Sequence, residues 1–190
     1  MKQIVCFPIL SSLAVCLLLG CAAAVSSGQQ PAPATAASPA PDPLASLSFM
    51  KGDWKGQQNF NNPGGGTMVG DATDKVDIGI GGRYLCETLS TTMPGRKPTD
   101  SRHFVSFDKQ SGKYGAWWFN DTGTHPTEFT GELSENKLVL TSNSTGPGPV
   151  LRATYETPAK NTLTYLLEMK QGESWIKLFL TTYTKVDAQP

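Results

Sequence analysis

Two histidines, His103 and His125, are the side chains of this sequence with the widest chemical use, as metal ligands or as acid–base groups. Neither has a partner at the short spacing that is typical of metal sites. His103 stands in an Arg-His-Phe-Val run that is typical of a strand, and His125 precedes a proline in a glycine-rich turn. We therefore expect no metal site, a packed strand position for His103 and a loop position for His125.

Patterns for other kinds of catalysis are missing from the sequence as well. It contains no Gly-x-Ser-x-Gly motif, the turn on which many hydrolases hold a nucleophilic serine. The triple glycine at 64–66 neither opens a helix nor precedes a Lys-Ser or Lys-Thr pair, so it predicts a hairpin tip and not a phosphate-binding loop. A Ser–His–Asp arrangement stays open, because serine and aspartate are frequent. The sequence favours a protein that is not an enzyme and has no cofactor.

Covalent chemistry is predicted most clearly at Cys21. Lys2 is followed by a mainly apolar run at 4–19, which is shorter than the roughly 20 residues of a membrane-spanning helix. A charged start, an apolar middle and a small-residue exit are typical of a secretory signal. The exit, Leu-Leu-Gly-Cys at 18–21, resembles the lipobox of bacterial lipoproteins, which implies lipidation of Cys21 and cleavage after Gly20. The alternative is an ordinary signal peptide that happens to end near a cysteine.

A lipidated Cys21 predicts where the protein is found. One acyl chain is a marginal anchor, so several chains on Cys21 would hold the protein on a membrane. Ala22 occupies the position at which an aspartate often marks inner-membrane retention, which favours the outer membrane of the bacterial cell envelope. Without residues 1–20, 15 basic residues face 16 acidic ones and are scattered along the chain. This balance predicts no nucleic-acid partner.

The cysteines predict a fold without cross-links. Cys6 and Cys16 leave with the signal peptide and Cys21 is lipidated, so Cys86 is the single thiol of the mature chain. Cys86 lies in a strand-like run and is interpreted as a buried packing residue, with a reactive thiol as the alternative.

The mature chain divides into a linker and one domain. Residues 21–43 are rich in proline, alanine, serine and threonine and cannot build a core, so they predict an extended tether. Asp42 and Pro43 are typical of a helix start, which predicts a short helical turn over 43–50. The domain is expected to cover 44–190.

Runs of β-branched and aromatic residues, separated by Gly, Pro, Asn and Asp, predict about ten strands in the domain. The expected strands are 53–60, 67–78, 83–92, 101–108, 113–120, 126–133, 137–143, 149–157, 161–169 and 174–186. Short connections favour antiparallel neighbours, and no helical period follows residue 50. A sheet of this size has to close or fold over to remove its edges. The sequence therefore predicts an all-β fold: a single antiparallel, up-and-down β-barrel.

Four short stretches stand out by their order and spacing. They are Phe-Met-Lys-Gly-Asp-Trp-Lys-Gly at 49–56, Asn-Pro-Gly-Gly-Gly at 62–66, Gly-Arg-Tyr-Leu at 82–85, and Phe-Asp at 107–108 with Lys-Tyr at 113–114. They resemble the bacterial domain of unknown function 1579 family, and the Gly-x-Trp-x-Gly start is similar to that of lipocalins and nitrobindin-like haem proteins. The resemblance implies a calycin-type barrel whose Trp54 seals one end. It implies no activity.

A barrel of this kind can enclose one small ligand. For the apolar part of such a pocket we expect Trp117, Phe119, Tyr165 and Trp175, and for its polar groups Arg83, Glu87 or His103. Because neighbours on a strand point to opposite faces, Trp117 and Phe119 share one side and Trp118 takes the other. Packing of these aromatic residues in a filled core is the alternative.

Three functions follow. The favoured one is a membrane-anchored, non-enzymatic binding module for a small apolar ligand; the second is a structural or accessory envelope lipoprotein with a filled barrel; an enzyme is the least favoured. Haem-binding relatives use a histidine late in the chain, and residues 137–186 contain none, so haem binding is not expected.

Overall fold

The computed structural model describes residues 42–62, 65–121, 123–143 and 148–186. The predicted signal peptide at 1–20, Cys21, and the linker up to residue 41 lie outside the described residues, so those predictions remain predictions. The described part forms ten strands and one short 3₁₀ helix. The elements are η1 (Ala45–Met50), β1 (Gly52–Asn61), β2 (Thr67–Gly79), β3 (Tyr84–Thr92), β4 (Thr99–Asp108), β5 (Lys113–Asn120), β6 (Thr127–Ser134), β7 (Lys137–Ser142), β8 (Leu151–Ala159), β9 (Thr162–Gln171) and β10 (Ser174–Lys185).

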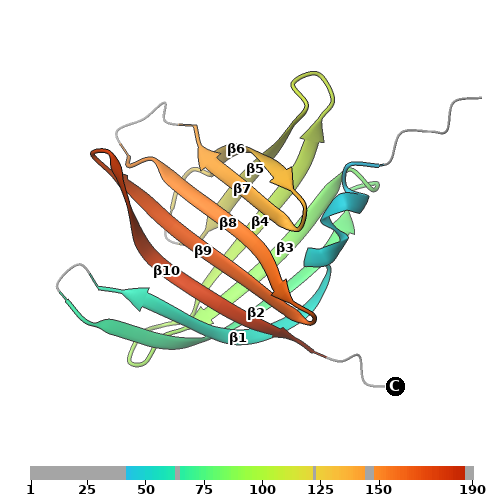
Figure 1. The fold of residues 1–190 in the computed structure, drawn as a ribbon. Coiled ribbons are helices and arrows are strands. Elements are labelled where there is room, and N and C mark those ends of the chain that lie inside the picture. Colours follow the sequence, from blue (N-terminus) through green and yellow to red (C-terminus); the bar gives the residue numbers. More distant parts are fainter. Residues whose placement is uncertain (1–41, 63–64, 122, 144–147, 187–190) are drawn as a thin grey trace, which may run out of the picture. The chain divides into compact units, whose positions relative to one another are not determined.

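The strands form one closed antiparallel barrel in simple chain order, with β10 pairing back onto β1 (Figure 1). The up-and-down barrel predicted from the strand pattern is confirmed, and the predicted strand boundaries lie within two residues of the observed ones. Closure leaves no strand edge unpaired, which removes the usual site of edge-to-edge association.

Strict alternation decides which side chains fill the barrel. On β2, for example, Gly70, Ala72, Asp74 and Val76 are buried, and the residues between them are exposed. The pattern follows from the period of two of a strand, which sends successive side chains to opposite faces of the sheet. Asp74 is therefore a carboxyl group at a core position.

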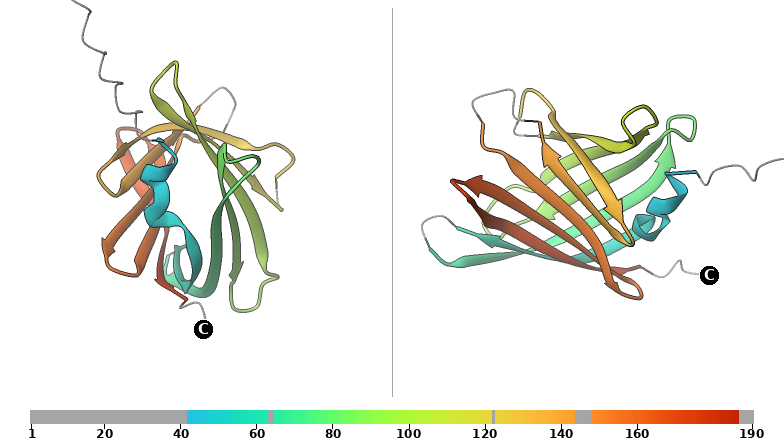
Figure 2. Two further views of the ribbon diagram at one scale, coloured as in Figure 1. Left: turned by 90° about the vertical axis from the view of Figure 1, so that its right-hand side faces the viewer. Right: turned by 45° about the horizontal axis from the view of Figure 1, so that its top comes forward.

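A short helix covers one end of the barrel. In the left-hand view of Figure 2, η1 lies across this end, which we call the closed end. Leu47 and Met50 of η1 are fully buried. Trp54 is 2% exposed, and its indole N–H donates a hydrogen bond to the Met50 carbonyl at 2.8 Å. A Cβ atom at Gly56 would lie 1.9 Å from the Thr182 carbonyl oxygen, so only glycine lets β1 approach β10 here.

The opposite end, which we call the open end, is formed by the connections that follow β1, β3, β5, β7 and β9. In the β1–β2 connection, Gly65 and Gly66 both have positive φ, as the predicted hairpin tip requires. His125 lies exposed in the β5–β6 connection, so its predicted loop position is confirmed. No helix crosses the open end within the described residues.

Cys86 departs from its prediction. It is half-buried on the outward face of β3, beside Gly79 of β2, because the inward positions on either side belong to Leu85 and Glu87. Partial burial raises the pKa of the thiol, which favours the unreactive protonated form.

Candidate functional site

A polar cluster lies in the middle of the barrel interior. Glu87 of β3 and His103 of β4 stand opposite each other in register and are 2% and 4% exposed. His103 Nδ1 bonds to Glu87 Oε2, and the hydroxyl of buried Tyr155 on β8 donates to the same oxygen at 2.8 Å. The Tyr155 hydroxyl also lies 2.8 Å from His103 Nδ1. Two strands, β4 and β8, thus bring His103 and Tyr155 to one carboxylate oxygen of Glu87 on β3.

Burial and the interactions among these side chains set the protonation states of Glu87 and Asp74. Burial alone would raise the pKa of Glu87, but the interaction with His103, together with the hydrogen bonds of Asp74 and Tyr155, lowers it below its ordinary value. Burial, and then the negative charge of Glu87, raise the pKa of Asp74 to about 11. At neutral pH, Glu87 is therefore ionised and Asp74 is a neutral acid.

Several buried polar atoms around the cluster make no hydrogen bond to the protein among the described residues. They are His103 Nε2, Trp118 Nε1, and the hydroxyls of Tyr165 and Tyr183. The carboxyl groups of Asp74 and Glu87 are partners of each other, since neutral Asp74 donates a hydrogen bond to ionised Glu87. A buried polar group without a partner costs about 1–3 kcal/mol, so such a gathering needs a reason. A small cavity lined by His103, Trp118, Tyr155 and Tyr165 has a volume of about 10 Å³, which is room for about one water molecule.

A larger pocket lies between this cluster and the open end, with a volume of about 200 Å³. Trp118 lines both the pocket and the small cavity, so its ring separates the two. The lining side chains come from β1, β2, β3, β4, β5 and β10 and from the β3–β4 connection. They are Gln58, Phe60, Met68, Leu89, Thr91, Met93, Arg96, Lys97, Thr99, Ser101, Trp118 and Phe179.

Gln58 is a polar group of the pocket wall that two hydrogen bonds hold in place. It is buried, and its Oε1 accepts hydrogen bonds from the hydroxyls of Thr91 at 3.3 Å and Thr181 at 3.2 Å. Because two hydroxyls occupy the oxygen, the amide N–H₂ is left as the donor that Gln58 offers to a ligand.

Three of the seven predicted pocket residues come together in the barrel interior. Glu87, His103 and Tyr165 are buried side by side, and the rings of His103 and Tyr165 meet edge to face with centroids 5.9 Å apart. Glu87, His103 and Tyr165 belong to the polar cluster and do not line the 200 Å³ pocket.

The other four predictions are wrong, since these residues lie outside the barrel. Arg83 is exposed in the turn before β3 at the closed end. Trp117 and Phe119 face outward and, with Ile80, Tyr84 and Phe104, line a shallow apolar hollow on the outer surface. Phe119 is 45% exposed. Trp175 lies under the Arg152 guanidinium, and the guanidinium carbon is 4.2 Å from the centroid of the Trp175 ring.

Two physical reasons explain these errors. Alternation places Trp117 and Phe119 on one face, as predicted, but the inner face is the one that carries Trp118, which stands opposite buried His103. In β10 a bulge between Lys177 and Phe179 shifts the register, so a count of alternate residues from Phe179 assigns Trp175 to the wrong side.

Sequence reasoning missed the whole pocket wall and two members of the polar cluster, Asp74 and Tyr155. Asp74 could have been found, because it continues the inward phase of Ala72 and Val76 on β2. Arg96 and Lys97 lie in a loop, for which strand periodicity carries no signal.

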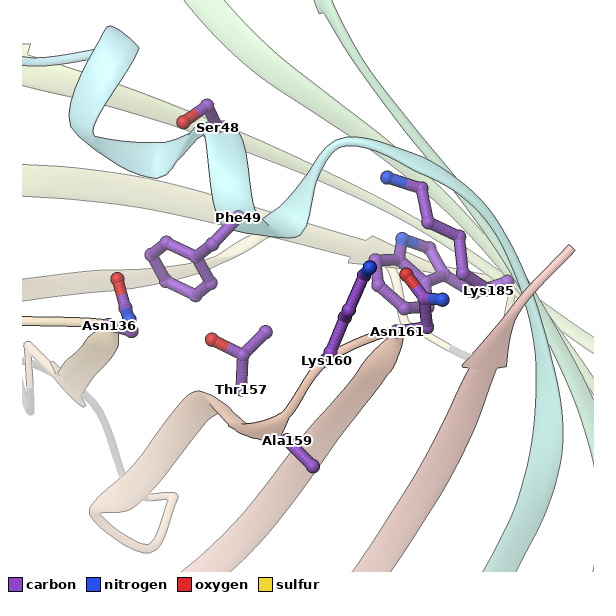
Figure 3. Close-up of a pocket in the computed structure, with 9 residues that line it drawn as sticks. Ser48, Phe49, Asn136, Thr157, Ala159, Lys160, Asn161 and Lys185 are labelled. Carbon is purple, nitrogen blue, oxygen red and sulfur yellow. The ribbon is translucent and has the colours of Figure 1, made fainter. Parts of the chain in front are cut away.

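A second hollow, of about 370 Å³, lies outside the barrel at the closed end. Figure 3 shows Phe49 reaching from η1 toward Thr157 of β8, with Lys160 and Lys185 to one side. Lys185 Nζ lies 5.4 Å from the ring centroid of Trp54, which also lines this groove. The groove contains none of the unpartnered polar atoms of the barrel interior.

Among the described side chains, no group of three or more His, Cys, Asp or Glu residues is arranged to hold a metal ion. The same part of the chain forms no helix that is long and apolar enough to cross a membrane.

A closed antiparallel barrel with one covered end and a pocket at the other is a lipocalin-like architecture. The chain belongs to the family described as "Protein of unknown function (DUF1579)", whose model matches residues 42–185. The family resemblance seen in the four sequence stretches is thereby confirmed.

Two solved structures are similar to the barrel. Rv2717c from M. tuberculosis has 16% identity and a TM-score of 0.57, over 75% of this chain and 96% of that chain. The S-type phycobiliprotein lyase CPES from Guillardia theta has 6% identity and a TM-score of 0.54, over 77% of this chain and 93% of that chain. At these identities the likeness shows the fold alone. No curated protein matches the chain.

Proposed function

We propose that the barrel is a non-enzymatic binding module that takes one small, largely apolar ligand in the pocket at the open end. The observation that carries this proposal is the pocket wall, in which Phe60, Met68, Leu89, Met93 and Phe179 surround a few polar groups. Mostly apolar walls with a few placed polar groups are typical of small-molecule sites. At about 200 Å³ the pocket is smaller than the roughly 300–1,000 Å³ of sites for drug-sized molecules, which favours a smaller guest.

The alternative, a structural lipoprotein with a filled barrel, fits only part of the interior. Near the closed end, Leu85, Leu138 and Leu163 are fully buried. Toward the open end, Phe60 and Met68 remain partly exposed around the hollow. A protein that needed only a filled core would gain about 25 cal/mol for each Å² of apolar surface buried there, so the hollow costs stability that ligand binding can restore.

The test is a titration of the chain from Ala22 onward, which lacks the predicted lipidation site, with octan-1-ol. Tryptophan fluorescence monitors binding. Trp118 is the tryptophan in the pocket wall, so saturable binding should change its emission. Leu89→Trp, which fills the pocket, should abolish the response, and Phe119→Ala on the outer face should leave it unchanged. No saturable response in the unmodified chain, together with a crystal structure in which side chains fill the pocket, would favour the filled-barrel alternative.

We also propose that the chain is anchored through acyl groups on Cys21 in the bacterial cell envelope, at the outer membrane. The support is the Leu-Leu-Gly-Cys sequence at 18–21 and the proline-rich tether that follows it. Metabolic labelling with a clickable palmitate analogue should mark the wild-type chain and leave Cys21→Ser unmarked and released from the membrane fraction. Labelling of Cys21→Ser would contradict the anchor.

Haem remains an unfavoured ligand in this proposal. His103 is held through Nδ1 by Glu87, and its Nε2 is buried beside a cavity of about 10 Å³, which is far smaller than a porphyrin needs. Titration with haemin should give no stoichiometric Soret band. A band at one equivalent that is lost in His103→Ala would contradict this expectation.

A further inference from the structure

The charged side chains of the open-end pocket all have one sign. Of its twelve lining residues, Arg96 and Lys97 carry charge and none is acidic. Both cations lie in the β3–β4 connection, where a turn with a hydrogen bond from the Arg96 N–H to the Met93 carbonyl at 3.1 Å places them at the mouth. An anionic group at the mouth would meet two cations and no opposing carboxylate of the wall.

One uncharged polar side chain of the wall also favours an acceptor on the ligand. Gln58 offers amide N–H₂, because its oxygen already accepts two hydroxyl hydrogen bonds. The hydroxyls of Thr99 and Ser101 can donate to an acceptor as well.

The buried carboxyl groups behind Trp118 do not oppose an anion strongly. Asp74 is uncharged in the folded protein at neutral pH, and Glu87 Oε2 is hydrogen-bonded to His103 and Tyr155. Between the mouth and Trp118, Leu89 and Phe179 supply apolar surface beside the polar side chains of Gln58, Thr91 and Ser101.

We propose that the ligand is an anionic amphiphile, a small single-chain carboxylate whose head lies against Arg96 and Lys97 and whose chain extends toward Trp118. This inference rests on the proposed binding function and names the ligand class for the same pocket. It predicts that affinity depends on the charge of the head group at constant chain length.

The experiment compares three probes of one chain length, octanoate, octan-1-ol and octylamine, by calorimetric titration of the mature chain from Ala22 onward. Octanoate should bind about tenfold more tightly than octan-1-ol, since an exposed ion pair contributes up to about fivefold and two cations are present. Octylamine should bind most weakly. The advantage of octanoate should shrink as ionic strength rises, because salt screens exposed charges beyond roughly 8–10 Å.

The decisive variant is the double substitution Arg96→Gln and Lys97→Gln. It should weaken octanoate about tenfold and octan-1-ol by less than about twofold, and the retained octan-1-ol binding shows that the pocket still folds. The matched control, Lys109→Gln with Lys113→Gln, removes two exposed cations at the closed end and should change neither probe.

The outcomes separate the two proposals. Equal affinity for octanoate and octan-1-ol, or unchanged octanoate binding in the double variant, overturns the anionic ligand and leaves the binding module standing. Failure of all three probes to bind overturns the binding module itself.

Discussion

The two ends of the barrel use the same strands in opposite ways. β1 places Trp54 in the closed end, where η1 covers it and its indole N–H is bonded, and places Phe60 in the open end, where it borders a hollow. β3 does the same with Leu85, which is fully buried, and Leu89, which lines the pocket. One strand set thus supplies a buried plug at one end and a pocket at the other, with the cluster of Glu87 and His103 between them.

The largest effect is expected at the closed end. Trp54→Ala should lower the free energy of unfolding by about 3–5 kcal/mol, because it removes a buried aromatic ring and leaves a cavity that η1 cannot fill. Urea denaturation measures this cost. Trp175→Ala, which removes an outward-facing ring, is the control and should cost far less. A similar cost for both would mean that the closed end is not the main source of stability.

A substitution in the polar cluster between the two ends should destabilise the protein nearly as much. Glu87→Gln should cost about 3 kcal/mol at pH 7, because it replaces the buried carboxylate to which both His103 and Tyr155 are hydrogen-bonded. The folded-state pKa of Glu87 is lowered, so its contribution is present above the unfolded pKa of about 4.5 and is lost as pH falls below it.

Denaturation of wild type and variant across the acid range tests this sign, since the variant should lose less stability than wild type on acidification. Glu132→Gln removes an exposed partner of Lys113 and should change stability by less than about 0.5 kcal/mol. An identical acid dependence in Glu87→Gln and wild type would contradict the buried pair.

Asp74→Asn should have the opposite effect and raise the free energy of unfolding. The pKa of Asp74 is raised from 3.8 to about 11 in the folded protein, so its contribution is complete below about pH 4 and is lost as pH rises toward 11. Asparagine stays neutral at every pH, and the variant should be more stable than wild type by about 1–3 kcal/mol at pH 7. Thermal melts at pH 5, 7 and 9 should show a gain that grows with pH. Asp71→Asn, exposed on the same strand, should show none.

The smallest expected effect is a difference in stability between matched leucine substitutions at the two ends. Leu85→Ala and Leu89→Ala remove the same atoms from the same face of β3, but Leu85 is enclosed and Leu89 borders a pocket that already exists. Leu85→Ala should therefore cost about 1 kcal/mol more, through the new cavity. Equal costs in urea denaturation would mean that the open end is packed as tightly as the closed end.

The fold was predictable because its signals are local. Glycine, proline and asparagine separate the strands, and the Gly-x-Trp-x-Gly start predicts the sealed end at Trp54, which the structure confirms. The site was only partly predictable, because alternation groups Trp117 with Phe119 without saying which face turns inward. Closure of the whole barrel decides that, and it turns Trp118 inward instead. The bulge in β10 and the loop position of Arg96 leave no periodic trace in the sequence.

The pairing of β1 with β10 has a consequence for the time course of folding. Gln58 and Thr181, which are joined by a hydrogen bond inside the barrel, are 123 residues apart along the chain. The pocket wall contains Gln58 from β1 and Phe179 from β10, so it is complete only after the last strand has been synthesised and has paired with the first. Contacts of such high sequence separation slow folding, since a long loop must be closed before they form. The open-end pocket is therefore among the last parts of the molecule to form.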